Sequence, residues 1–151
     1  MPLEGRSRRE LAAPGSLCYH QNMSGRLVYI VDDSPDLAAT LEIACGAIHD
    51  VEVKVATGAE QAWEMLRAAT DATASVIVTD VQMPETDGIE LIRRIRADQR
   101  LSQLPVVVVT GESDPETRRR LQELAISACF PKPYSPVSVK NQVEALLDAQ
   151  P

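Results

Sequence analysis

Short apolar runs rich in β-branched residues alternate along the chain with longer segments whose apolar residues recur every three or four positions. The short runs are typical of strands buried in a parallel sheet, and the longer segments are typical of helices that pack on such a sheet. Strands are predicted over residues 27–31, 51–55, 76–80, 105–110 and 128–130. A helix is predicted after each strand.

The second predicted strand differs from the others. Val51, Val53 and Val55 alternate with Glu52 and Lys54, which is the pattern of a half-exposed edge strand. Strands that alternate with helices through short loops predict an α/β fold with a parallel sheet, helices on both faces and right-handed crossovers. With the second strand at an edge, we expect a doubly wound, flavodoxin-like sheet of five strands in the order 2-1-3-4-5.

The sequence also predicts where some helices begin and which faces they expose. Thr57 and Glu60 have the spacing of a capping box at the start of the second helix. Asp87 is the expected N-cap of the third helix. Isoleucines on the inner face of that helix leave three arginines for solvent: Arg93, Arg94 and Arg96.

Length and local composition predict one domain with an extension. The chain has 151 residues, enough for a single sizeable core. Residues 1–25 lack both apolar periodicity and the apolar core of a signal peptide. We therefore expect a disordered N-terminal extension over residues 1–25 and a folded domain over residues 26–149. Translation from Met23 would remove almost all of this extension.

Charge and cysteine content argue against several classes of function. A net charge of −7 and a pI near 4.8 argue against nucleic-acid binding through a basic surface. No apolar run approaches the roughly 20 residues needed to span a bilayer, so no membrane association is expected. The three cysteines are widely spaced and form no CxxC pair, which predicts a reduced, cytoplasmic protein.

Polar residues stand at or just after the ends of four predicted strands. They are Asp32 and Asp33 (first strand), Asp80 (third), Thr110 (fourth) and Lys132 (fifth). The carboxyl ends of parallel strands meet at one edge of the sheet, where α/β folds bind ligands. We therefore expect these side chains to converge. The expected strand order places the switch point between the first and third strands, beside the aspartates.

This set of side chains predicts a particular chemistry. Three carboxylates a few ångströms apart repel one another unless a cation lies among them. Their hard oxygen atoms favour magnesium, which binds one or two carboxylates together with water and phosphoryl oxygens. The Lys132 ammonium and the Thr110 hydroxyl can both interact with a phosphoryl group. Together these groups are what in-line phosphoryl transfer to an aspartate requires.

The segment from Leu27 to about Leu147 resembles the receiver domains of two-component response regulators. The resemblance rests on motifs that follow one another in the family's order: Val31-Asp32-Asp33, Asp80 with Met83-Pro84 and Asp87-Gly88, Val109-Thr110-Gly111, and Lys132-Pro133. It implies that Asp80 is the phosphoacceptor. It also implies that Asp33, Asp80 and the backbone carbonyl of Gln82 bind Mg²⁺ directly, and that Asp32 binds it through water.

The resemblance implies roles for the fourth and fifth strands as well. Thr110 is expected to bind a phosphoryl oxygen, Lys132 to pair with the phosphoryl group, and the Lys132-Pro133 peptide to be cis. Two positions depart from the family's pattern. Pro131, directly before the lysine, removes a backbone donor from the last strand, which is tolerated mainly at a sheet edge. The other is Cys129. Receiver domains commonly have Tyr or Phe three residues before the lysine as a rotameric switch, and here that residue is Cys129. Phe130 follows it and should point to the opposite face of the strand.

A signalling module that is not an enzyme is therefore the implied function. It accepts a phosphoryl group from a partner histidine kinase or histidine phosphotransfer protein, and it catalyses only its own phosphorylation and dephosphorylation. The fourth helix, fifth strand and fifth helix would form the switched surface for a downstream protein, or for a phosphorylation-dependent homodimer. Two alternatives remain open: a phosphorylation-independent receiver-like scaffold and a haloacid-dehalogenase-type phosphatase. Such phosphatases carry a second acid two residues after a nucleophile that ends the first strand, where this chain has Ser34 after Asp32.

Overall fold

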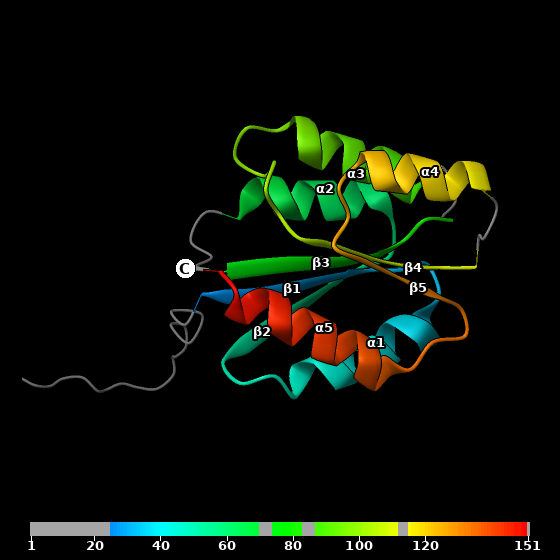
Figure 1. Cartoon of the computed structure of the whole chain (residues 1–151). Coiled ribbons are helices and arrows are strands. Elements are labelled where there is room, and N and C mark those ends of the chain that lie inside the picture. Colours follow the sequence, from blue (N-terminus) through cyan, green and yellow to red (C-terminus); the bar gives the residue numbers. More distant parts are fainter. Residues whose placement is uncertain (1–24, 70–73, 83–86, 112–114, 151) are drawn as a thin grey trace, which may run out of the picture.

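The computed structural model describes residues 25–69, 74–82, 87–111 and 115–150 (Figure 1). The extension predicted over residues 1–25 lies outside this part of the chain, apart from Gly25. The described strands are β1 (Arg26–Val31), β2 (Val51–Ala56), β3 (Ala74–Asp80), β4 (Val106–Thr110) and β5 (Ala128–Pro131). The described helices are α1 (Pro35–Gly46), α2 (Ala59–Ala68), α3 (Gly88–Ala97), α4 (Pro115–Glu123) and α5 (Pro136–Asp148).

The strands form one sheet in the order β2-β1-β3-β4-β5, and every neighbouring pair is parallel. This arrangement confirms the predicted fold class and strand order. β2 lies at an edge, where only Ala56 is fully buried, as the alternating sequence of this strand predicts. β1 and β3 lie side by side in the interior of the sheet, and Val31 pairs with Thr79 near their carboxyl ends.

Helices cover both faces of the sheet (Figure 1). α1 and α5 lie on one face, and α2, α3 and α4 lie on the other. Successive side chains of β1 alternate between the two layers. Val28 and Ile30 belong to the apolar cluster beneath α1 and α5, which we call the α1/α5 cluster. Tyr29 and Val31 belong to the cluster on the opposite face.

Within the described part of the chain, side-chain caps begin three of the helices. The Ser34 Oγ accepts from the Leu37 N–H, the Asp87 Oδ1 accepts from the Glu90 N–H at 2.9 Å, and the Ser135 Oγ accepts from the Ser138 N–H. The prediction that Asp87 caps the third helix is therefore confirmed.

The predicted capping box at the start of α2 is wrong. The N-cap of α2 is Gly58, one residue later than predicted. That shift places Gln61, rather than Glu60, at the third helical position. The Gln61 Oε1 then accepts from the Thr57 N–H at 2.9 Å.

The prediction that Arg96 points into solvent is also wrong. Its guanidinium donates to backbone carbonyls of the loop between α3 and β4 and to carbonyls at the end of α4: Ser102, Leu104, Leu124 and Ala125. Burial lowers the pKa of Arg96. The last carbonyls of a helix have no partner within that helix, so a guanidinium placed beneath the end of α4 satisfies them.

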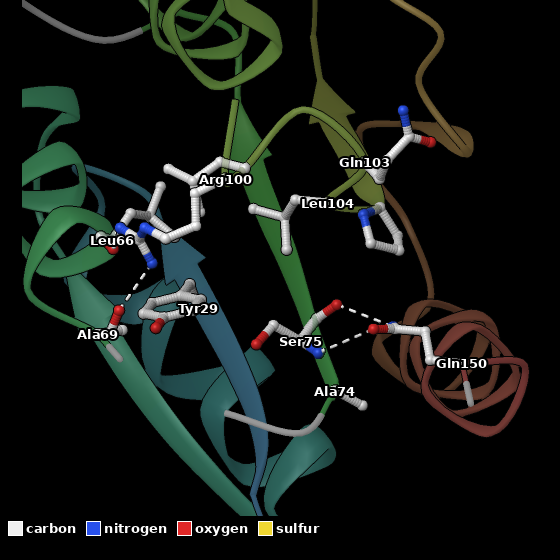
Figure 2. Close-up of a pocket in the computed structure, with 11 residues that line it drawn as sticks. Tyr29, Leu66, Ala69, Ala74, Ser75, Arg100, Gln103, Leu104 and Gln150 are labelled. Atoms are coloured by element: carbon white, nitrogen blue, oxygen red, sulfur yellow. Dashed lines mark hydrogen bonds between the residues drawn. The ribbon is translucent and has the colours of Figure 1, made fainter. Parts of the chain in front are cut away.

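A cavity of about 310 Å³ lies at the amino edge of the sheet (Figure 2). Gln150 holds the start of β3 there through both the N–H and the carbonyl of Ser75. The Arg100 guanidinium caps the end of α2 through the carbonyls of Leu66 and Ala69. Both side chains are thus bonded to backbone groups, and the aspartates lie at the other, carboxyl edge of the sheet. No helix in the described part of the chain is both long and apolar enough to span a bilayer.

Candidate functional site

The predicted site residues converge at the carboxyl edge of β1 and β3. Asp32 and Asp33 directly follow β1, and Asp80 is the last residue of β3. Because the two strands are in register up to their ends, these side chains enter the same space. Carboxylate oxygens of the three aspartates lie within 4.8 Å of one another.

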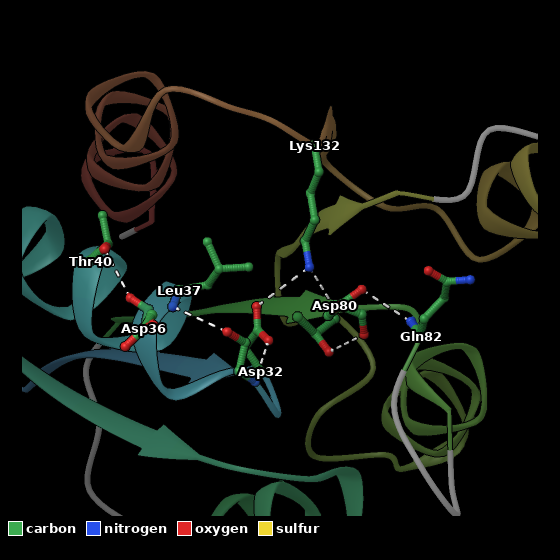
Figure 3. Close-up of polar contacts among 9 residues, drawn as sticks. Asp32, Asp36, Leu37, Thr40, Asp80, Gln82 and Lys132 are labelled. Carbon is green, nitrogen blue, oxygen red and sulfur yellow. Dashed lines mark hydrogen bonds and ion pairs between the residues drawn. The ribbon is translucent and has the colours of Figure 1, made fainter.

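The aspartates differ in exposure and in hydrogen bonding (Figure 3). Asp32 is 1% exposed and Asp80 is 3% exposed, whereas Asp33 is open to solvent. The Asp32 Oδ1 accepts from the Ser34 N–H at 2.9 Å, and the Asp80 Oδ1 accepts from the Gln82 N–H at 3.0 Å. The backbone at the strand ends thus holds one oxygen of each buried carboxylate. The Oδ2 atoms of Asp32 and Asp80 accept no backbone hydrogen bond in the described part of the chain and can interact with a cation.

Lys132 supplies the only cationic side chain that the structure pairs with these aspartates among the described residues. Its Nζ donates to the Asp80 Oδ2 at 2.8 Å and lies 3.8 Å from the Asp32 Oδ2. Burial alone would lower the pKa of Lys132, but its hydrogen bond to Asp80 and the negative charges around it raise that pKa. The ammonium therefore stays charged and points toward both buried carboxylates.

One ammonium does not remove the electrostatic cost of the cluster. Burial raises the pKa of Asp32 above its usual value, and the charges of Asp80 and Asp33 raise it further. The Ser34 N–H and Lys132 oppose this shift without cancelling it. Clustered carboxylate oxygens, one of them open to solvent, are the donor set that Mg²⁺ prefers, because this ion keeps part of its water shell. The residues present fit a magnesium ion.

The remaining predicted residues also lie at this edge. Thr110, the last residue of β4, is only 2% exposed. It directly follows Val109, the residue of β4 that pairs with Asp80 of β3. Gln82 places its backbone directly beside Asp80, two residues away. The Lys132-Pro133 peptide is cis, as predicted. Met83-Pro84 lies outside the described residues.

Cys129 and Phe130 lie in different environments, as expected for neighbouring side chains that point to opposite faces of a strand. Cys129 is exposed on β5, whereas Phe130 packs against the α1/α5 cluster. The phenylalanine therefore does not take the place of the missing aromatic residue on the face that Cys129 occupies.

The structure places two further residues beside the site: Gly88, which the sequence analysis named only as part of a motif, and Tyr134, which it missed. Gly88 packs against the strand end, where its N–H donates to the Val81 carbonyl at 2.9 Å and a Cβ atom would collide with the Asp80 carbonyl. The glycine after Asp87 could have indicated such a close approach. Tyr134 has a buried hydroxyl without a hydrogen-bond partner among the described residues. Nothing in the sequence distinguishes this tyrosine from a residue that only packs.

Comparison with known proteins agrees with the geometry. The family model of the response regulator receiver domain matches residues 28–144. The chemotaxis protein CheY1 of Helicobacter pylori strain J99 is 28% identical over 118 residues, which are 78% of this chain and 94% of that protein. The transcriptional regulatory protein GltR of Pseudomonas aeruginosa is 32% identical over 82% of this chain and 50% of that protein.

Solved structures show the same architecture. A response regulator receiver protein from Pseudomonas putida superposes with a TM-score of 0.71 at 28% identity, covering 80% of this chain and 96% of that chain. The chemotaxis protein CheY4 of Vibrio cholerae superposes with a TM-score of 0.71 at 23% identity, covering 81% and 98%, and supports the fold alone. With the family model spanning most of the chain and the motif residues meeting at one edge, this chain belongs to the response regulator receiver domain family of two-component signalling.

Proposed function

We propose that Asp80 accepts a phosphoryl group from a histidine of a partner kinase or phosphotransfer protein. The observation that carries this proposal is the pairing of a buried carboxylate at the end of β3 with the Lys132 ammonium at 2.8 Å, beside two further carboxylates. In the transfer, an Asp80 oxygen forms a bond to phosphorus while the bond from phosphorus to the imidazole nitrogen breaks. The histidine keeps the electron pair of that bond.

The other residues of the edge would position the group and balance its charge. Asp33, Asp80 and the Gln82 carbonyl would hold Mg²⁺, and Asp32 would hold one of the waters on the ion. The metal supplies charge neutralisation for the phosphoryl oxygens when it is bound. Thr110 would donate its hydroxyl to one of these oxygens. Positioning and charge neutralisation provide most of the catalysis in such transfers.

The receiver domain would comprise residues 26–149, with residues 1–25 as an N-terminal extension. Phosphorylation would be transmitted to the surface of α4, β5 and α5, because Thr110 precedes the loop that leads to α4. A downstream protein would bind this surface, or a second copy of the domain would. The protein would act on no substrate other than its own aspartate.

Labelling with a small phosphodonor tests the proposal. The parent protein, treated with acetyl phosphate and Mg²⁺, should gain the mass of one phosphoryl group, and Asp80→Asn should gain none. Asp36→Asn is the control, because Asp36 is an exposed aspartate in the first turn of α1. An unlabelled parent would favour the phosphorylation-independent scaffold. Steady turnover of phosphate monoesters would favour the phosphatase.

A further inference from the structure

Two buried side-chain oxygens in the described part of the chain have no hydrogen-bond partner. They are the Asp32 Oδ2 and the Tyr134 hydroxyl. A buried polar atom left without a partner costs free energy, so most such atoms in native proteins bond to protein or to an ordered water. Two unpaired atoms near the same site point to a shared partner.

Both side chains lie on the same side of the sheet. Asp32 continues the alternation of Val28 and Ile30, whose side chains belong to the α1/α5 cluster. The strand geometry extends to this residue, because the Asp32 N–H still donates to the Ala56 carbonyl of β2 at 3.1 Å. Tyr134 packs against the same α1/α5 cluster from the loop between β5 and α5.

Lys132 links the two residues. It lies two positions before Tyr134 in the chain, and its Nζ is 3.8 Å from the Asp32 Oδ2, too far for a hydrogen bond. Lys132 and Tyr134 line one wall of a groove, and Leu37 of α1 lines the other. An ammonium and a carboxylate oxygen 3.8 Å apart, with a buried phenol beside the same groove, leave a typical position for a bridging water.

Electrostatics support the proximity of the phenol to the acids. Burial raises the pKa of Tyr134 to about 12, and the negative charges of Asp32 and Asp80 contribute to this rise. The phenol therefore keeps its proton at neutral pH and is available as a donor. Asp32 is an acceptor when ionised.

We propose that Tyr134 is a positioning residue for Asp32. Its hydroxyl donates to one water molecule, which also accepts from the Lys132 Nζ and donates to the Asp32 Oδ2. Three polar partners are the usual number for a buried water. The bridge fixes the orientation of the Asp32 carboxylate, as outer hydrogen bonds do for groups around metal ions. Its consequence for Mg²⁺ binding rests on the proposed function.

A double-mutant cycle in metal-free buffer tests the bridge. Tyr134→Phe removes only the hydroxyl, and Asp32→Ala removes the carboxylate to which the bridging water would donate. In the parent background, Tyr134→Phe should raise the unfolding equilibrium constant roughly twofold to tenfold, as expected for one net hydrogen bond. In the Asp32→Ala background the same change should have almost no effect. Additive effects, or a stabilising Tyr134→Phe, would show an unpaired hydroxyl and overturn the proposal.

Magnesium titration by calorimetry gives the second measurement. Tyr134→Phe should weaken the binding of Mg²⁺ roughly twofold to tenfold, by the same hydrogen-bond reasoning. Tyr29→Phe is the matched control, because Tyr29 is also a buried tyrosine but lines the cavity at the amino edge, and it should leave the binding unchanged. Equal affinities in parent and Tyr134→Phe would contradict the positioning role. A parent that does not bind Mg²⁺ would count against the proposed function, while the metal-free cycle would still test the bridge.

Discussion

The Lys132 Nζ lies 2.8 Å from the Asp80 Oδ2, although 52 positions separate the two residues in the chain. Asp80 ends β3 and Lys132 follows β5, so the ammonium reaches across the end of β4, which lies between them. The Thr110 carbonyl at the end of β4 accepts from the Lys132 N–H at 2.9 Å and holds the lysine backbone at this edge. A phosphoryl group on Asp80 would thus form beside an ammonium that is already in position.

Magnesium should stabilise the fold, and Asp33 should carry much of this effect. A ligand that binds only the native state adds RT ln(1 + [L]/Kd), about 2.7 kcal/mol at 100 times the Kd. Asp33→Ala should remove most of the dependence of the melting temperature on magnesium, and it should raise stability without metal because one of three clustered charges is gone. Asp36→Ala serves as the control. Full retention of the dependence in Asp33→Ala would exclude Asp33 as a main ligand.

Gly88 should be required for the geometry of Asp80. A Cβ at this position would collide with the Asp80 carbonyl, so Gly88→Ala should lower the free energy of unfolding by about 1–3 kcal/mol and slow phosphorylation. Gly46→Ala is the matched control. No atom lies within 4 Å of a Cβ at position 46 in α1, and alanine there should add up to about 1 kcal/mol. Urea unfolding measures both. Equal effects of the two substitutions would contradict the close contact.

Arg96 should anchor the end of α4. Arg96→Ala leaves carbonyls of four residues without their donor, so the free energy of unfolding should fall by about 2–4 kcal/mol. Amide exchange near Leu124 should also become faster. Arg93→Ala is the comparison, because Arg93 is exposed and its one ion pair among the described residues is with Glu90 at 3.7 Å, so the substitution should cost less than about 0.5 kcal/mol. Similar losses for both arginines would argue against the anchor.

Cys45 should make the protein less stable in alkaline solution. Burial raises the pKa of its thiol from 9.0 to about 11. Between pH 9 and pH 11 the thiol is deprotonated in the unfolded chain but still protonated in the folded chain. The contribution of this thiol to the free energy of unfolding is therefore fully present below pH 9 and is lost as the pH rises toward 11. Cys45→Ala should reduce this alkaline loss by about 2–3 kcal/mol, measured by urea unfolding across the pH range. Cys129→Ala removes an exposed thiol and should reduce the alkaline loss of stability by less than Cys45→Ala does.

Cys129 should limit the response of α4 to phosphorylation. A small thiol cannot fill the space that the Thr110 hydroxyl would leave, so the coupling would run through the loop after Gly111 and produce a modest shift in a pre-existing equilibrium. Cys129→Tyr should enlarge the change in amide exchange over residues 115–125 when a phosphoryl mimic and Mg²⁺ are added, and Cys129→Ser should not. Changes confined to the metal site in every variant would exclude this route.

Local sequence pattern determined the order of elements, the edge position of β2 and the strand ends that carry Asp32, Asp33, Asp80 and Thr110. These features depend on the period of apolar residues and on the rule that parallel strands share a carboxyl edge. Both can be read within a few neighbouring positions. The convergence of the site therefore followed from the sequence before any side-chain contact was known.

Contacts between distant segments were decided only by the tertiary structure. Arg96 resembles any solvent-facing arginine of a helix until α4 places its terminal carbonyls above it. The start of α2 shifted by one residue because the extended backbone of Gly58 made it the N-cap. The approach of Gly88 to Asp80 and the burial of the Tyr134 hydroxyl depend on how loops pack against the strand ends. Apolar periodicity specifies which face of a helix or strand is buried. These contacts depend instead on which distant segment of the chain packs against it.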